Sequence, residues 1–291
     1  MIDKNKLLAR DFPVIEHTYT AKDCALFALG VGIGADPSAQ ADLRALYEGH
    51  DGFAPLPAMV NILAYPGFWA MEPDTGLTWQ KILHGEQSLT LHAPLPPSGT
   101  VQGRTRVTDI VDKGADKGAL IYSIREISDK VTGQLLAKVE STVFARGDGG
   151  FGGDAGPVKP VHTLPDRAPD CHHDFKTSPR AALIYRLSGD FNPLHVDPQI
   201  ATKAGFERPI LHGLCTMAVA SWSISMALRA GDFTALTHLR QRFSSPVYPG
   251  ETIRTDIWQD GDQISFRARA VERDVIVLNN GFARLTESDR K

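Results

Sequence analysis

Hydrophobic and polar positions alternate with a period of two in several parts of this chain, which is the pattern of strands buried on one face. Such antiparallel strands leave an apolar face free to cover a helix. The alternating apolar positions are Ile264, Phe266, Ala268 and Ala270 in the clearest run, Leu120, Tyr122 and Ile124 in another, and the run 137–143 in a third.

Two further segments predict apolar helices. The first is P-A-M-V-N-I-L-A-Y at 57–65, and the second is G-L-C-T-M-A-V-A-S-W-S-I-S-M-A-L at 213–228. The second is apolar on most sides, as a fully buried helix should be. Pro66 and Gly67 follow the first segment, so we expect that helix to be broken or loosened.

These elements occur twice in the same order. Segments 19–30 and 176–189 open the two halves, an apolar helix follows in each, and strands come last. The stretch 83–101 resembles 237–253, with His84 and Gln87 falling against His238 and Gln241. The Gly- and Pro-rich stretch 147–170 reads as a linker. We therefore predict an α+β chain with units at 1–146 and 171–291, each an antiparallel sheet round one helix. This is a double hot-dog fold that forms an internal pseudo-dimer.

The candidate chemistry lies in the run Y-R-L-S-G-D-F-N-P-L-H at 185–195. Pro193 and Gly189 exclude a regular strand, so Asp190, Asn192 and His195 are expected on a tight loop where they can converge. A carboxylate and an imidazole aimed at one small volume suit proton transfer near neutral pH. Asn192 can orient a water or a catalytic side chain, and it can also make an Asx-turn before Pro193.

A second cue is P-I-L-H-G-L-C-T at 209–216, where Gly213 begins the buried helix. A helix N-terminus offers free N–H groups and the positive end of a dipole. Gly213 therefore suits a position beside a developing oxyanion, although a plain helix start explains it as well. His212, next to it, is expected to be structural.

Composition and charge narrow the classes of function. The 291 residues carry a net charge of −3, which gives no reason to expect a nucleic-acid partner. No apolar stretch reaches the ~20 residues of a membrane span. Three cysteines cannot all pair, and their spacing fits no zinc pattern. Cys171-His172-His173 is expected to be a polar loop, not a metal site, and a cytoplasmic location is the default.

The motifs together resemble the hydratase 2 type of MaoC-like dehydratases, as found in the hydratase domain of peroxisomal multifunctional enzyme type 2. The resemblance covers nearly the whole chain. Its motifs stand in order: Y-E-G (47–49), L-H-G-E-Q (83–87), D-K-G (112–114), G-G-F-G-G (149–153), the run 185–197, A-G-F-E-R-P-I-L-H-G-L-C-T (204–216) and F-S-S-P-V-Y-P-G (243–250).

The resemblance implies reversible hydration of trans-2-enoyl-CoA to (3R)-3-hydroxyacyl-CoA, without metal or other cofactor. Carried over position by position, it makes Asp190 and His195 the acid/base pair, Asn192 their polar partner and Gly213 the oxyanion-hole glycine. It implies that His84, Gly85, Lys113 and Phe243 contact the CoA thioester, that Glu48 has a supporting role, and that the chain forms a homodimer. Directly after Gly30 the first half runs V-G-I-G-A-D-P-S, with no histidine and no Asp-x-Asn, so one active site per chain is expected, in the second half.

Two alternatives stay open at this point. A hot-dog thioesterase would act on similar substrates and release free CoA. A non-catalytic acyl-CoA-binding module would suit the first half but leaves the intact Asp-x-Asn-x-x-His run of the second half without a purpose.

Overall fold

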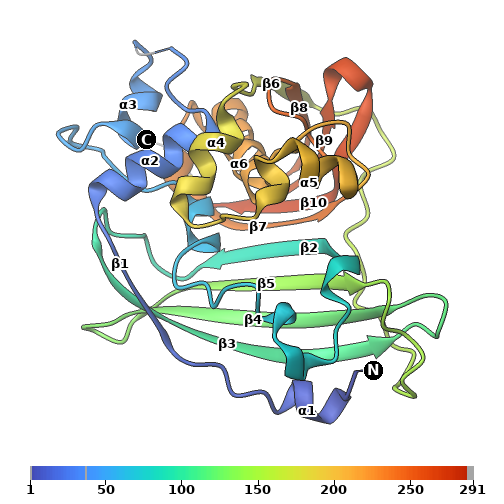
Figure 1. Ribbon diagram of the computed structural model, residues 1–291. Coiled ribbons are helices and arrows are strands. Elements are labelled where there is room, and N and C mark those ends of the chain that lie inside the picture. The colour runs from blue at the N-terminus through green and yellow to red at the C-terminus, as the bar shows by residue number, and fades with distance from the viewer. Residues whose placement is uncertain (1, 37, 287–291) are drawn as a thin grey trace.

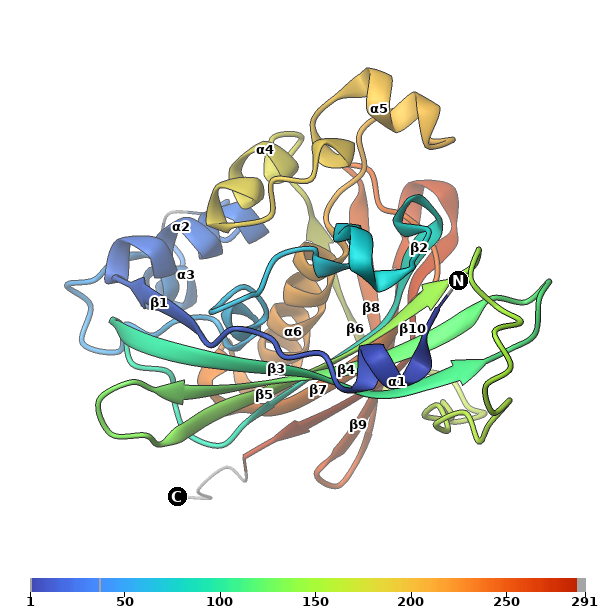
Figure 2. The same cartoon turned by 60° about the horizontal axis from the view of Figure 1, so that its bottom comes forward.

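The computed structural model describes residues 2–36 and 38–286. Its strands form one antiparallel ten-stranded sheet that curves round the central helix (Figures 1 and 2). The order along the sheet is β1 (Ile15–Tyr19), β3 (Gly99–Asp112), β4 (Ala119–Asp129), β5 (Leu135–Ala145), β2 (Ile82–Leu91), β7 (Leu236–Phe243), β10 (Val275–Leu285), β9 (Gln263–Ala270), β8 (Thr252–Asp260) and β6 (Cys171–Lys176).

The strand order of one half repeats that of the other in reverse, which confirms the double hot-dog architecture. The two expected sheets are continuous, because β2 pairs with β7 across the middle. In that pairing Gln87 lies directly opposite Gln241, its equivalent in the repeat. The pseudo-twofold axis between the halves therefore passes through this pair of glutamines.

The helices differ between the halves. The second half has the predicted buried helix, α6 (Gly213–Arg229), whose residues from Cys215 to Ser225 are all buried. The first half has a single 3₁₀ turn (Pro57–Asn61) where a helix over 57–65 was predicted. The remaining α-helices are α1 (Lys4–Leu8), α2 (Ala21–Val31), α3 (Gln40–Leu46), α4 (Ala181–Tyr185) and α5 (Pro198–Lys203).

The linker covers part of the outer face of the sheet. The Lys159 ammonium lies 4.8 Å from the centre of the Tyr122 ring, and Arg240 Nη2 donates to the carbonyl of Pro160 at 2.9 Å. Tyr122 thus faces the linker, whereas Arg125, on the opposite face of β4, turns toward the core. The predicted loop at Cys171-His172-His173 is wrong, because these residues begin the edge strand β6 and pair with β8.

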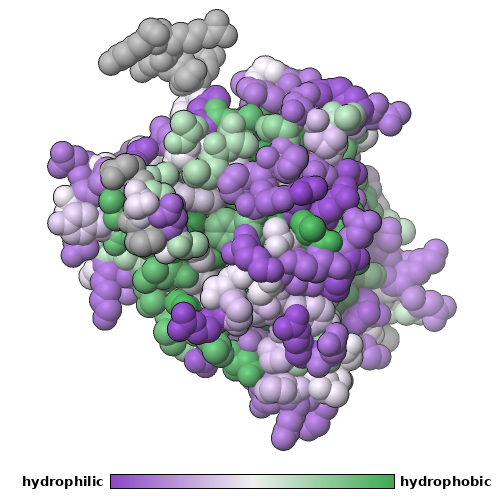
Figure 3. All heavy atoms as spheres, turned by 90° about the horizontal axis from the view of Figure 1, so that it is seen from above, coloured by the Kyte–Doolittle hydropathy of each residue, from purple (hydrophilic) through white to green (hydrophobic). Residues whose placement is uncertain are grey.

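The surface seen from above mixes hydrophobic and hydrophilic side chains (Figure 3). Within the described residues, every helix is too short or too polar to cross a membrane.

Candidate active site

Asp190 lies on the loop between the helical segment 181–188 and a 3₁₀ turn (Pro193–His195). Gly189, with φ of +123°, turns the chain in a conformation that side chains rarely adopt. Asn192 Oδ1 accepts from the N–H of Leu194 at 3.1 Å, and Asp190 Oδ1 accepts from the N–H of Asn192 at 3.2 Å. Asn192 thus makes the Asx-turn that precedes His195, and the Asn192 side chain is exposed.

His195 is buried, with 8% of its surface exposed. Its Nδ1 lies 2.9 Å from the carbonyl oxygen of Ile210, which can only accept, so Nδ1 carries the proton and Nε2 keeps a free lone pair. Burial lowers the pKa of His195, although the Ile210 carbonyl and the Asp190 charge oppose this. The imidazole is therefore neutral at pH 7 and can accept a proton.

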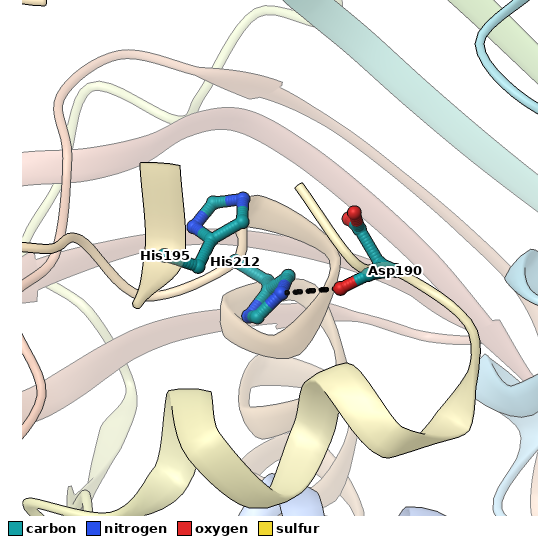
Figure 4. Close-up of side chains that lie close together, drawn as sticks. All are labelled: Asp190, His195 and His212. Atoms are coloured by element: carbon teal, nitrogen blue, oxygen red, sulfur yellow. Dashed lines mark hydrogen bonds between the residues drawn. The ribbon is translucent and has the colours of Figure 1, made fainter. Parts of the chain in front are cut away.

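His212 belongs to the same cluster, although we expected it to be only structural. Its ring stacks on that of His195, with centroids 3.7 Å apart and planes at 27°. Its Nε2 donates to the main-chain oxygen of Asp190 at 3.2 Å (Figure 4). Burial, followed by the neighbouring His195, lowers the pKa of His212 to about 4. Its place directly before Gly213 was the available sequence signal.

One polar side-chain atom each from Asp190, His195 and His212 lies within 4.8 Å of the others. Such spacing lets Asp190 and His195 hold one water between them, since hydrogen bonds to a water oxygen are about 2.8 Å long. The same three groups suggest a metal site, but their geometry fits one poorly. The stacked imidazoles direct their lone pairs in nearly parallel planes, whereas the ligands of a tetrahedral ion converge on one point.

Gly213 begins α6 next to this cluster, and the first N–H groups of the helix have no intrahelical acceptor. A Cβ added at Gly213 would lie 3.1 Å from Cε1 of Phe243, so glycine allows a close approach here. The Phe243 ring is in turn 4.6 Å from that of His84. The predicted residues Gly213, Phe243 and His84 therefore form one wall beside the helix N-terminus.

His84 and Gly85 lie at a bulge in β2. His84 pairs with Val143 and Glu86 with Thr142, which leaves Gly85 as the extra residue. A Cβ at Gly85 would be 3.1 Å from the carbonyl oxygen of Thr142, which explains the glycine. The His84 side chain is exposed, yet surrounding protein lowers its pKa. His84 therefore lies beside Phe243 with its side chain open to solvent.

Lys113 and Glu48 lie apart from the cluster. Lys113 is half-buried on the turn between β3 and β4, where its N–H donates to the carbonyl of Gly118 at 2.9 Å. Glu48 is exposed just after α3. Within the described part of the chain, no hydrogen bond or ion pair joins either side chain to Asp190, His195 or Gly213. Their assignment therefore still rests on the resemblance.

Comparison of the whole chain with known proteins identifies its family. The family model for the MFE-2 hydratase 2 N-terminal domain matches residues 17–147, and the model for the MaoC like domain matches 160–281. The enoyl-CoA hydratase ChsH3 of Mycobacterium tuberculosis is 39% identical over 286 residues, which cover 96% of this chain and 97% of that protein. The chain belongs to the hydratase 2 type of MaoC-like proteins.

Two further relatives show how this hydratase 2 chain compares with larger and solved proteins. The mouse peroxisomal multifunctional enzyme type 2 is 37% identical to this chain over 279 residues. The match covers 94% of this chain but only 37% of the longer mouse protein. A crystal structure of a MaoC-like dehydratase from Phytophthora capsici matches with a TM-score of 0.86 and 36% identity, covering 98% of this chain and 99% of that one.

Proposed function

We propose that this hydratase 2 chain is an (R)-specific 2-enoyl-CoA hydratase, a hydro-lyase that adds water reversibly to trans-2-enoyl-CoA. The observation that carries the proposal is the placement of Asp190 and a neutral His195 within water-bridging distance, next to the N-terminus of α6. The family and the named relatives support the same reaction.

In the proposed reaction, Asp190 and His195 hold the attacking water. Nε2 of His195 takes a proton as the water oxygen bonds to Cβ, and the π electrons move onto the thioester oxygen as an enolate. An N–H at Gly213 stabilises that oxyanion. A proton then passes from the Asp190–His195 pair to Cα, so the sum is one water added. One proton leaves the water and one proton reaches Cα, while the hydroxyl group stays on Cβ, so the step balances without an oxidant or a reductant.

We further propose roles for the units and the outlying residues. Residues 171–291 supply the catalytic groups, residues 1–146 bind substrate, and 147–170 link them. His84, Gly85, Lys113 and Phe243 contact the CoA thioester, and Glu48 supports the site. The α2–α4 pair and the 3₁₀ turn after α4 (Arg186–Ser188) expose Leu29, Leu183 and Leu187, which offers apolar surface to a homodimer. The particle mass in solution, set against 31.7 kDa per chain, tests the dimer.

The function is tested with trans-2-butenoyl-CoA and trans-2-decenoyl-CoA by following the loss of enoyl-thioester absorbance. The product is offered to (3R)- and (3S)-specific dehydrogenases. We expect only the 3R product, and a loss of kcat/KM of about 10²–10⁴ in Asp190→Asn, because this change removes an acid/base group but keeps its shape. Asp197→Asn is the control, since Asp197 only caps α5. Free CoA in place of a hydrated product would contradict the proposal and favour the thioesterase.

A further inference from the structure

The first half breaks its central helix at a position that its own sequence does not explain. Residues 57–64, P-A-M-V-N-I-L-A, include the good helix formers Ala58, Met59, Leu63 and Ala64, and Pro57 stands where proline is tolerated. Pro66 disfavours a helical Tyr65 and would end a helix there. The helical turn nevertheless ends at Asn61, and Ala64 has a left-handed φ of +48°.

Two side chains from distant strands take the hydrogen bonds that would continue the helix. In an α-helix the N–H of Ala64 donates to the carbonyl of Val60, and that of Tyr65 to the carbonyl of Asn61. Here Nη2 of Arg125 donates to both carbonyls, at 3.2 and 2.6 Å. The N–H of Ala64 donates instead to Nδ1 of His17, at 3.1 Å.

Arg125 is an unusual residue for this position. It projects from β4, is 6% exposed and forms no ion pair within the described chain. Its Nε has no hydrogen-bond partner there, and its guanidinium lies 5.3 Å from the centre of the Tyr65 ring. An unpaired buried charge is costly, so the two carbonyls and the ring face are its main compensation.

The second half provides an internal comparison. The equivalent of β4 in the repeated strand order is β9, whose inward residues Ile264, Phe266, Ala268 and Ala270 are apolar and buried. These side chains cannot donate to a main-chain carbonyl. In that half the helix, α6, runs for 17 residues without a break.

The unwound segment borders the candidate active site. Asn61 Nδ2 lies 3.5 Å from Sδ of Met217, one turn into α6, and Asn61 Oδ1 accepts from Gln87 at 2.8 Å. Gln87 Oε1 is 2.9 Å from Nε2 of His84. Tyr65 is 48% exposed, and a Cβ added at Gly67 would meet nothing within 4 Å. There is open space next to the segment.

We propose that Arg125 and His17 hold residues 61–65 unwound and thereby set the length of acyl chain that the site accepts. This inference rests on the proposed hydratase function. Without these two partners, the carbonyls of Val60 and Asn61 regain their helical donors, and the extra turn moves Tyr65 into the space that a long acyl chain would fill. Short substrates end before they reach it.

The test compares two substrates in Arg125→Met, which keeps an unbranched apolar stem but removes the donors. We expect kcat/KM for trans-2-decenoyl-CoA to fall about tenfold or more, and that for trans-2-butenoyl-CoA to stay within about twofold. His17→Phe, which removes the acceptor, should shift the ratio in the same direction. Arg125→Lys keeps a donor and should restore part of the ratio of kcat/KM for trans-2-decenoyl-CoA to kcat/KM for trans-2-butenoyl-CoA. Arg106→Met, which breaks an exposed ion pair with Glu126, is the control and should leave the ratio unchanged.

Equal losses on both substrates, or an unchanged ratio in Arg125→Met and His17→Phe, would overturn the inference and leave these residues a structural role. Failure of both variants to fold has the same meaning. A wild type restricted to the four-carbon substrate also overturns it. A wild type that hydrates neither substrate contradicts the hydratase proposal itself, so the two failures are distinguishable.

Discussion

At the scale of single residues, the site depends on histidines that stay neutral. Nδ1 of His195 donates a hydrogen bond to the carbonyl of Ile210. Nε2 of the stacked His212 donates one to the main-chain carbonyl of Asp190. Each bond fixes which nitrogen carries the proton. A proton on His195 would remove its basic lone pair and would also place a charge 3.7 Å from the second ring.

We therefore expect His195 to titrate below pH 6.5, because burial lowers its pKa. NMR of histidine-labelled protein measures this, with His195→Gln assigning the signal. In Asp190→Asn the pKa should fall further, since the Asp190 charge favours the imidazolium and is lost. The acid limb of kcat/KM in the wild type should follow the same group. A midpoint at or above 6.5, or a rise in Asp190→Asn, would contradict this account.

At the scale of elements, periodicity and repetition revealed most of the fold. The alternation in 263–270 gives β9, the apolar run 213–228 gives α6, and the matched segments give the two halves. The break at Asn61 was only partly visible, because Pro66 and Gly67 are local signals but Arg125 and His17 lie far away in sequence. The role of His212 was not predicted, because its stack with His195 joins segments that are apart in sequence, and its place before Gly213 was the one local signal.

The turn between β3 and β4 supports another prediction. The Asp112 carboxylate accepts from the N–H groups of Gly150 at 2.7 Å, Gly114 at 2.9 Å and Gly152 at 3.0 Å, which locks the turn that carries Lys113. If Lys113 meets a CoA phosphate, Asp112→Asn should raise KM for trans-2-butenoyl-CoA about tenfold, with kcat within about twofold. The crotonyl N-acetylcysteamine thioester has no phosphate, so its kcat/KM should not change.

Asp116→Asn is the matched control for that experiment, because Asp116 is exposed on the same turn. An equal loss on both thioesters would mean that Asp112 acts on the fold and not on phosphate recognition. Loss only on the CoA substrate would extend the binding surface to the edge of the first half, far along the sheet from the catalytic loop (Figure 1).

At the scale of the whole molecule, the two halves have diverged in complementary ways. The second half has an intact central helix, and its N-terminus lies beside Asp190 and His195. The first half has only a 3₁₀ turn at that position, and there is open space at Gly67 after the turn. The continuous β2–β7 pairing holds both within one sheet. This arrangement supports the proposal of one catalytic centre per chain, to which the second half contributes the acid/base groups and the first half a binding surface.

The folded chain also keeps many histidines neutral, which should make it sensitive to mild acid. Burial lowers the pKa of six partly or fully buried histidines below 6.5: His17, His162, His173, His195, His212 and His238. The unfolded chain therefore binds more protons than the folded chain once the pH falls below about 6.5. The free energy of unfolding therefore has its full value above that pH. It decreases as the pH falls toward the pKa values of the folded chain.

For His212 alone, a shift from 6.5 to about 4 corresponds to about 3 kcal/mol. Carboxylates with lowered pKa values, such as Glu272 at about 2, lose their contribution only below about pH 4.5, so pH 7.5 and pH 5 isolate the histidines. Urea unfolding should give a clearly smaller free energy at pH 5. His212→Gln should narrow the difference, whereas exposed His92→Gln should not. Equal free energies at both pH values would mean that these histidines are protonated in the folded state as readily as in the unfolded one.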